Sequence, residues 1–192
     1  MVSLRVLVVP EDPTYNGYIL KPVIQALLAA AGRPRAVVTV LSSPRLTGFD
    51  HAMRAIRDEL PAKYRHFDLW IFVPDADRAG EAAMAKLEAD LGKVGIRLLV
   101  CAAQPEVEIY ACVAHRASLG MSWNDARQHR SFKEQVFEPV LARHGDPRRP
   151  GGGRDQLVAS ALSNFQALLQ FCPELATLLE RIRGQVADMQ EP

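Results

Sequence analysis

Short apolar runs alternate with amphipathic segments along the first half of the chain, and this alternation is the feature that most limits the fold. Each apolar run is brief and rich in β-branched or aromatic residues, which is typical of a buried strand. Each intervening segment has apolar residues at helical spacing. Strands that alternate with helices predict a parallel sheet with helices on both faces. The predicted strands are 5–9, 36–41, 69–73 and 96–102, and the predicted helices are 17–31, 49–60 and 78–91.

Proline and glycine residues mark the starts and ends of these predicted helices. Pro22 is placed in the first turns of helix 17–31, where a missing N–H is tolerated, and Gly32 follows as a stop. Pro61 is expected to end the second helix. This punctuation supports an α/β class with a four-stranded, Rossmann-like parallel sheet.

The second half of the chain is predicted to be mainly helical. Asp155 is expected to cap a helix, and Pro173 suits the first turn of the next one. The segment 145–153 combines Gly, Pro and two arginines and is predicted to be flexible. The expected helices are 105–114, part of 123–144, 155–169 and 173–186.

Length and composition indicate one domain with an ordinary core. The chain has 192 residues, 48% of them hydrophobic and 23% charged, which is usual for a soluble globular protein. We expect an α/β core over residues 1–115, with residues 116–192 as a helical extension packed on it. The oligomeric state stays open, and a homo-oligomer is compatible with the sequence.

Charge and cysteine content restrict the environment. The net charge of +1 indicates no overall field for nucleic acid or membranes, although a local basic face remains compatible with it. The three cysteines lack disulfide or zinc-ligand spacing, so buried free thiols are expected. The N-terminus lacks the pattern of a signal peptide, and no stretch has the length of a membrane span. We therefore expect a cytoplasmic protein without a membrane partner.

Two aspartates follow the third predicted strand, and they are the strongest functional signal. Asp75 and Asp77 stand two residues apart, so their side chains are expected on the same side of the strand end. Neighbouring carboxylates repel unless a proton or cation lies between them, and Mg²⁺ is a suitable occupant. A solvated turn explains the same residues about as well.

Further carboxylates follow other predicted strands. Glu11 comes just after the first strand, and Glu108 lies beyond the fourth, two residues after Glu106. Ligands of open α/β sheets bind beyond the carboxyl ends of the strands. This inventory suits metal-dependent phosphoryl transfer, in which an Asp pair holds Mg²⁺ or Mn²⁺ and a Glu moves a proton or holds a second ion.

These residues and their order resemble the Toprim domain of topoisomerases, bacterial primases and OLD-type nucleases. More narrowly, the chain resembles small stand-alone Toprim-like proteins that are often encoded beside ABC-type ATPases in phage-defence loci. The matching residues are Glu11 and Thr14 of the first motif, Asp75-Ala76-Asp77-Arg78 of the second, and Pro105, Glu108 and the aromatic Tyr110 of the third.

The resemblance implies a metal-dependent phosphodiesterase that cuts DNA or RNA, gated by an ABC- or OLD-type ATPase. Glu11, Asp75, Asp77 and Glu108 would be the catalytic residues, and Glu11, Asp75 and Asp77 would hold Mg²⁺ or Mn²⁺.

The first motif departs from the family pattern at two positions. Asp12 stands where glycine is usual, and Tyr15 stands where an acid is usual. Asp12 can replace the missing carboxylate, which favours an active nuclease. Alternatively the site is degenerate, and the chain is a non-catalytic module that binds a partner ATPase or nucleic acid.

Several basic residues have two interpretations each. Arg78 either meets a phosphate or balances the neighbouring acids. Arg154 follows three glycines and either grips a phosphate or belongs to a solvated linker. Arg127 and Lys133 lie in a polar stretch and are interpreted as surface charges.

Overall fold

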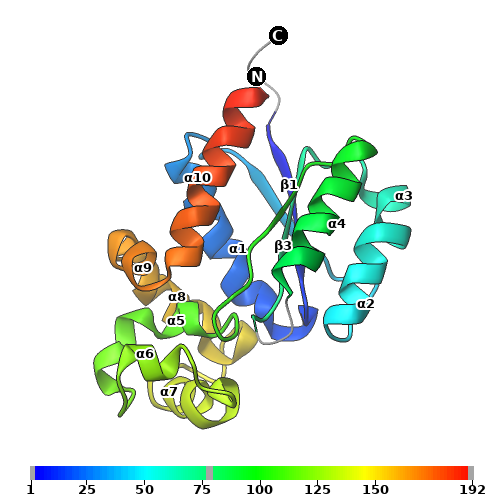
Figure 1. Ribbon diagram of the computed structural model, residues 1–192. Coiled ribbons are helices and arrows are strands. Elements are labelled where there is room, and N and C mark those ends of the chain that lie inside the picture. Colours follow the sequence, from blue (N-terminus) through cyan, green and yellow to red (C-terminus); the bar gives the residue numbers. More distant parts are fainter. Residues whose placement is uncertain (1–2, 77–79, 190–192) are drawn as a thin grey trace.

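The computed structural model describes residues 3–76 and 80–189, which form an α/β structure around a parallel sheet (Figure 1). Among these residues the sheet has four strands in the order β2-β1-β3-β4, and every pair is parallel. The predicted α/β class is therefore confirmed. Strand β3 has the predicted bounds, whereas β2 and β4 are shorter than predicted. The strands are β1 (Arg5–Pro10), β2 (Val37–Val40), β3 (Leu69–Val73) and β4 (Leu98–Val100).

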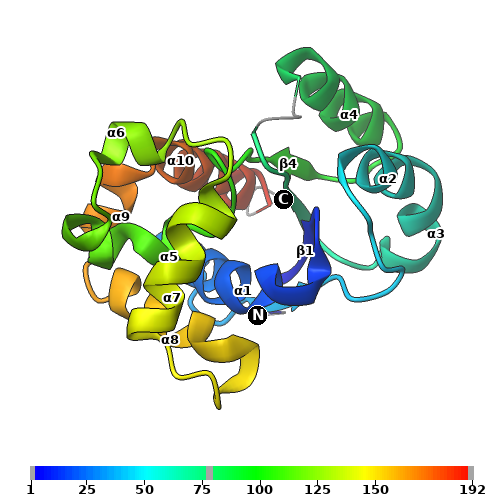
Figure 2. The same ribbon diagram turned by 90° about the horizontal axis from the view of Figure 1, so that it is seen from below.

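The two faces of the sheet bury different residues of the same strands, because side chains alternate along a strand. Val8 and Ile71 belong to a core shared with α1 (Pro13–Ala30), α10 (Pro173–Asp188) and other helices of the second half. Val9 and Phe72 belong to the other core, beneath the helices between 49 and 93. Figure 2 shows the two helical layers on opposite sides of the sheet.

Helix α1 begins earlier than predicted. Asp12 is its N-cap and accepts a hydrogen bond from the Thr14 N–H at 2.8 Å, and Pro13 occupies the first turn. These are strong helix-start signals. Pro22 therefore lies inside the helix rather than in its first turns, which corrects the sequence prediction. Gly32 has a φ of 81° just beyond the helix, which confirms the predicted stop.

Pro61 does not end the second helical segment. Helix α2 (Phe49–Arg54) passes through a π-helical turn, Ala55–Glu59, into α3 (Leu60–Tyr64). Pro61 lies in the first turn of α3, directly after Leu60, whose N–H donates across the π turn to the Ala55 carbonyl. The wider π turn thus lets the chain stay helical past the proline.

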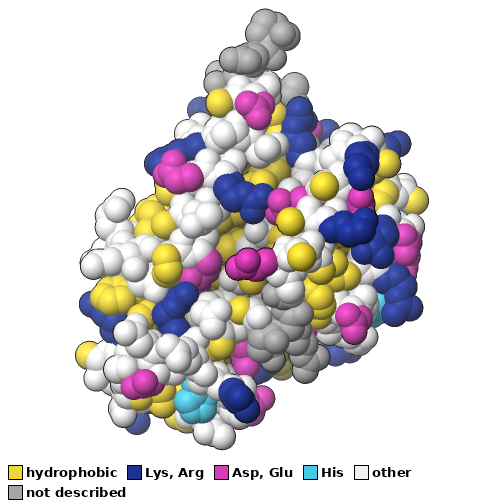
Figure 3. All heavy atoms as spheres, in the orientation of Figure 1, with side chains coloured by type: hydrophobic (Ala, Val, Ile, Leu, Met, Phe, Trp, Pro, Cys, Tyr) yellow, Lys and Arg dark blue, Asp and Glu magenta, His cyan; other side chains and the backbone are white. Residues whose placement is uncertain are grey.

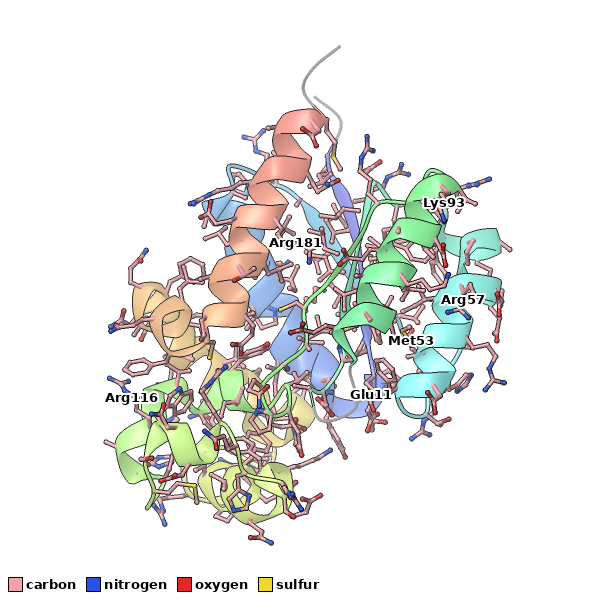
Figure 4. The ribbon with its side chains drawn as sticks, in the orientation of Figure 1. Glu11, Met53, Arg57, Lys93, Arg116 and Arg181 are labelled. Carbon is pink, nitrogen blue, oxygen red and sulfur yellow. The ribbon has the colours of Figure 1, made fainter. Side chains whose placement is uncertain are left out.

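The edge strand β4 is covered by side chains from two helices. Glu88 of α4 (Glu81–Lys93) accepts a hydrogen bond from the Val100 N–H and pairs with Arg181 of α10 at 2.7 Å. Arg181 also donates to the Val100 carbonyl at 3.0 Å. Figure 4 shows Arg181 on α10, facing the sheet edge. The N–H and carbonyl groups of Val100 on this edge are thereby satisfied, which hinders pairing with another strand there.

The second half forms a set of short helices that pack on the first core. The predicted helix 105–114 is helical only from Ile109, and 155–169 is split where Asn164 caps a new helix. The predicted cap Asp155 instead lies in the first turn and pairs with Arg149 at 2.7 Å. The helices are α5 (Ile109–Cys112), Val113–Ser118 (3₁₀), α6 (Trp123–Ala126), Lys133–Phe137 (π), α7 (Glu138–His144), Pro150–Gly153 (3₁₀), α8 (Arg154–Leu162) and α9 (Phe165–Phe171).

The glycine-rich segment 145–153 is exposed over residues 147–150 and ends in the 3₁₀ turn Pro150–Gly153, which packs against α1. A Cβ on Gly151 would lie 2.6 Å from Cγ of Tyr18, so glycine lets the backbone rest against the ring. Elsewhere, the three cysteines are free and buried, as expected from the sequence. No helix among the described residues has the length and apolar character needed to cross a membrane.

Candidate active site

Three carboxylates predicted from the sequence come together beyond the carboxyl ends of β1 and β3. Glu11 follows β1 directly, and its side chain is only 7% exposed. Asp75 follows β3, whose neighbour in the sheet is β1. Glu108 directly precedes α5 and is 2% exposed. Figure 4 shows Glu11 at the lower end of the sheet, between the starts of α1 and α4.

Backbone hydrogen bonds fix Asp75 between Glu11 and the segment that carries Glu108. The Asp75 N–H donates to Oε2 of Glu11 at 3.1 Å, and Oδ1 of Asp75 accepts from the Val107 N–H at 3.3 Å. An isolated parallel bridge pairs Asp75 with Ala103. The segment after β4 therefore continues the sheet pairing and brings Glu108 towards the end of β3.

The electrostatics of Asp75 are those of a crowded carboxylate cluster. Burial, followed by the negative charges of Glu108, Glu11 and Glu106, raises its pKa to about 8, against a lowering by the Val107 hydrogen bond. A carboxyl group with this pKa is mostly protonated at pH 7, unless a cation compensates the surrounding charge. The site therefore favours positive charge.

Asp77 and Arg78 lie outside the described residues. The predictions that Asp77 holds a metal ion with Asp75 and that Arg78 contacts a phosphate therefore concern residues outside this description.

Asp12 has a structural role at the start of α1, whatever else it does. Burial raises its pKa, but the hydrogen bonds from Thr14 and the charges of Lys133 and Arg45 outweigh this effect and hold the pKa below its usual value. An ionised N-cap is also favoured by the helix dipole.

Tyr15 and Arg154 contact one another. The Arg154 guanidinium lies 4.3 Å from the centre of the Tyr15 ring and 5.2 Å from that of Phe137. Arg154 is 6% exposed, donates to the Gly151 carbonyl at 3.0 Å, and lies 3.6 Å from Glu138. The structure thus places Arg154 within the packing of the helices, with little surface left for a phosphate.

Lys133 is the residue that sequence reasoning missed. It was interpreted as a surface charge, but its Nζ lies 3.5 Å from Oε1 of Glu108. Burial lowers the pKa of Lys133, and the adjacent Glu108 more than compensates, so that the pKa is raised. The neighbouring Phe132 and Phe137 are fully buried. This apolar flank was the available sign that the segment packs inward. Arg127 was misread in the same way and pairs with Glu174 at 2.8 Å.

A pocket of about 300 Å³ adjoins the carboxylate cluster. Its lining includes Ala76 and Glu106 from the segments after β3 and β4, and His129 and Arg130 from the segment after α6. Nδ1 of His129 accepts a hydrogen bond from the Ser131 N–H at 3.3 Å, so a neutral His129 carries its proton on Nε2. The pocket lining therefore includes both a carboxylate and hydrogen-bond donors.

The donor set suits a hard cation, although its geometry is incomplete among the described residues. Carboxylate oxygens are the ligands that Mg²⁺ prefers, and Oε1 of the buried Glu108 accepts no hydrogen bond from the described residues. Within 3–76 and 80–189, no three His, Cys, Asp or Glu side chains are grouped closely enough to hold a metal ion. Glu11 and Asp75 would hold such an ion, with Asp77 from the segment outside this description.

No family model, curated protein or solved structure matches the chain. The resemblance to Toprim domains consequently rests on the motif residues and on the α/β order of the elements.

Proposed function

We propose that this chain is a metal-dependent phosphodiesterase that cuts DNA or RNA, with its catalytic site beyond the carboxyl ends of β1 and β3. The observation that carries the proposal is the raised pKa of Asp75, about 8, in a cluster with Glu11 and Glu108. Clusters that keep carboxylates ionised only in the presence of a cation are typical of catalytic metal sites. The motif resemblance adds the reaction type, which is hydrolysis of a phosphodiester.

Each residue of the site would have a role that follows from its position. Asp75, together with Asp77, would hold the ion, which would neutralise phosphate charge and activate a water molecule. Glu11 is held beside Asp75 by the backbone hydrogen bond at 3.1 Å, so it is placed to take the proton of the attacking water or to serve as a further ligand. His129 and Arg130, which line the adjoining pocket, would bind the phosphate oxygens.

Basic and acidic side chains are mixed on the surface over α3 and α4. Figure 3 shows basic side chains gathered over α3 and α4 on one side of the face. On α4, Lys86 and Lys93 share a single partner, Asp90. With Glu81 and Glu88, α4 carries three acidic side chains against two basic ones, so its basic side chains are balanced by acidic ones.

The proposal is tested by cleavage of single- and double-stranded DNA and RNA in Mg²⁺ and in Mn²⁺. We expect cleavage by the unaltered chain and its loss, by a factor on the order of 100 or more, in Asp75→Asn, Glu11→Gln and Glu108→Gln. Asp90→Asn is the matched control, since it removes a carboxylate that pairs on the exposed surface of α4. Cleavage retained in both Asp75→Asn and Glu11→Gln would show that these residues do not perform the reaction.

A non-catalytic Toprim-like module is the second candidate, and the structure of the first motif favours it. Asp12 is engaged as an N-cap and Tyr15 as a stacking partner of Arg154, so neither supplies an evident additional ligand. Such a module would bind a partner ATPase of the ABC or OLD type, or nucleic acid, without cutting. This candidate predicts no cleavage with any metal. It also predicts that an ABC- or OLD-type ATPase is recovered in a stable complex when the chain is purified from its native host.

A further inference from the structure

Lys133 lies at a position where its positive charge acts on the carboxylate cluster. It begins the π-helical turn Lys133–Phe137, which is anchored by the fully buried Phe132 and Phe137. Its Nζ lies 3.5 Å from Oε1 of Glu108, and 32% of its side chain is exposed, against 2% for Glu108. The lysine is thus a tethered cation that reaches a buried carboxylate from the rim of the site.

The ammonium group of Lys133 compensates the negative charge of the buried Glu108 carboxylate. Within the described part of the chain, Lys133 is the one cation at ion-pair distance from Glu108. Oε1 of Glu108 accepts no hydrogen bond there. The charge of Lys133 also interacts favourably with Asp12 and Glu106. A buried carboxylate without a cation is strongly unfavourable, so the ammonium group stabilises the cluster when no metal is present.

We propose that Lys133 is a built-in counter-cation of the carboxylate site. Its positive charge prevents a second divalent ion from binding beside Glu108. The inference rests on the proposed metal site and deepens it by assigning its regulation. Lys133 and a divalent ion near Glu108 would repel, so the site would take one divalent ion on the Asp75 and Glu11 side. Removal of the lysine charge would open the Glu108 side to a second ion.

Removal of the Lys133 charge is expected to raise the affinity for divalent ions and to lower the stability of the metal-free protein. In Lys133→Met, divalent ions would bind more tightly, on the order of tenfold, because a repelling charge close to the site is gone. In the absence of metal, the same variant would be less stable, with a midpoint of thermal unfolding lower by several degrees, because Glu108 stays buried without a partner. Lys133→Arg keeps the charge and would differ little from the unaltered chain in either measurement.

The test is Mn²⁺ titration by calorimetry, together with thermal unfolding in EDTA and in Mn²⁺, on the full chain. Lys86→Met is the matched control, since it removes a lysine that pairs with Asp90 on the exposed surface of α4. We expect one Mn²⁺ per chain without substitution, tighter or additional binding in Lys133→Met, and unchanged binding in Lys133→Arg and Lys86→Met. Asp75→Asn would lose Mn²⁺ binding.

The results of these titrations distinguish failure of the Lys133 proposal from failure of the proposed metal site. Equal affinity and stoichiometry in Lys133→Met and the unaltered chain, with binding lost in Asp75→Asn, would overturn the counter-cation and leave the metal site standing. Weaker binding in Lys133→Met would also overturn it, since the lysine would then organise the ligands. No Mn²⁺ binding by any of these proteins would remove the metal site itself. Should Lys133→Met fail to fold, Lys133→Gln, which keeps a polar side chain of similar length, replaces it.

Discussion

The backbone N–H of Asp75 donates a hydrogen bond to Oε2 of Glu11, with 3.1 Å between the two atoms. The bond joins the ends of the two central strands, in which Pro10 and Val73 are paired in register. This hydrogen bond gives the Glu11 carboxylate a partner, and the negative charge of Glu11 still acts on the Asp75 carboxyl group. Local backbone pairing thus creates the electrostatic coupling of the site.

Replacing Glu11 by Gln is expected to lower the pKa of Asp75. The amide oxygen can still accept the hydrogen bond, but one of the negative charges that raise the pKa is lost. Because burial is the largest cause, the pKa should stay above the usual range for Asp. An NMR titration of the carboxyl carbon measures the change, with Glu180→Gln on α10 as the control. An unchanged pKa would show that the two carboxylates are not coupled.

The stability of the metal-free protein should fall as the pH rises from about 4 towards 8. The pKa of Asp75 is about 8 in the folded state and about 3.9 in an unfolded chain, so the folded state binds the extra proton between these values. The resulting contribution is fully present below the unfolded pKa and is lost as the pH rises through the folded one. Urea unfolding in EDTA should give a flatter pH profile for Asp75→Asn. Parallel profiles would contradict the raised pKa.

Substitution of Asp12 separates a capping role from a metal-binding one. Asp12→Ala should lower the free energy of unfolding by about 1 kcal/mol, because the bond to the Thr14 N–H is lost. Asp12→Asn can still cap the helix and should change the free energy of unfolding by only roughly 0.3 kcal/mol. Neither change should alter Mn²⁺ affinity more than about twofold. Loss of Mn²⁺ binding in Asp12→Asn would instead make Asp12 a ligand.

Arg154 should matter for stability more than for phosphate binding. Arg154→Ala removes a buried side chain between Tyr15 and Phe137 and should cost about 2–3 kcal/mol of unfolding free energy. Arg148→Ala is the control, since Arg148 pairs with Asp146 on the surface and should cost no more than about 0.5 kcal/mol. A stable Arg154→Ala protein with weakened nucleic-acid binding would restore the phosphate interpretation.

Gly151→Ala should destabilise the chain more than Gly32→Ala does. Both glycines have positive φ, at 71° and 81°, so alanine is strained at either position. Only at Gly151 would the new Cβ meet another group, the Tyr18 ring at 2.6 Å; at Gly32 nothing lies within 4 Å. We expect about 1 kcal/mol for Gly32→Ala and at least about 2 kcal/mol for Gly151→Ala. Chemical denaturation measures both, and equal losses would mean that the turn yields to the new methyl group.

The parallel sheet was predictable because its signals are local. The segment 69–73 is continuously apolar, and the structure buries all of its residues. Errors arose where two local signals competed. Pro61 was interpreted as a stop, although a π turn carries the chain past it. The helix start at Asp12 and Pro13 was overlooked because the same residues were interpreted as part of a functional motif.

The sequence by itself determined the α/β order of the elements and placed Glu11 and Asp75 just beyond strand ends, because periodicity and strand length are properties of neighbouring residues. Only the tertiary structure decided which charges meet. Lys133 reaches Glu108 because a helical segment far along the chain packs over the end of the sheet. Burial and proximity then set the pKa of Asp75. Such Coulomb interactions depend on distance in space and on exclusion of water, neither of which local sequence spacing specifies.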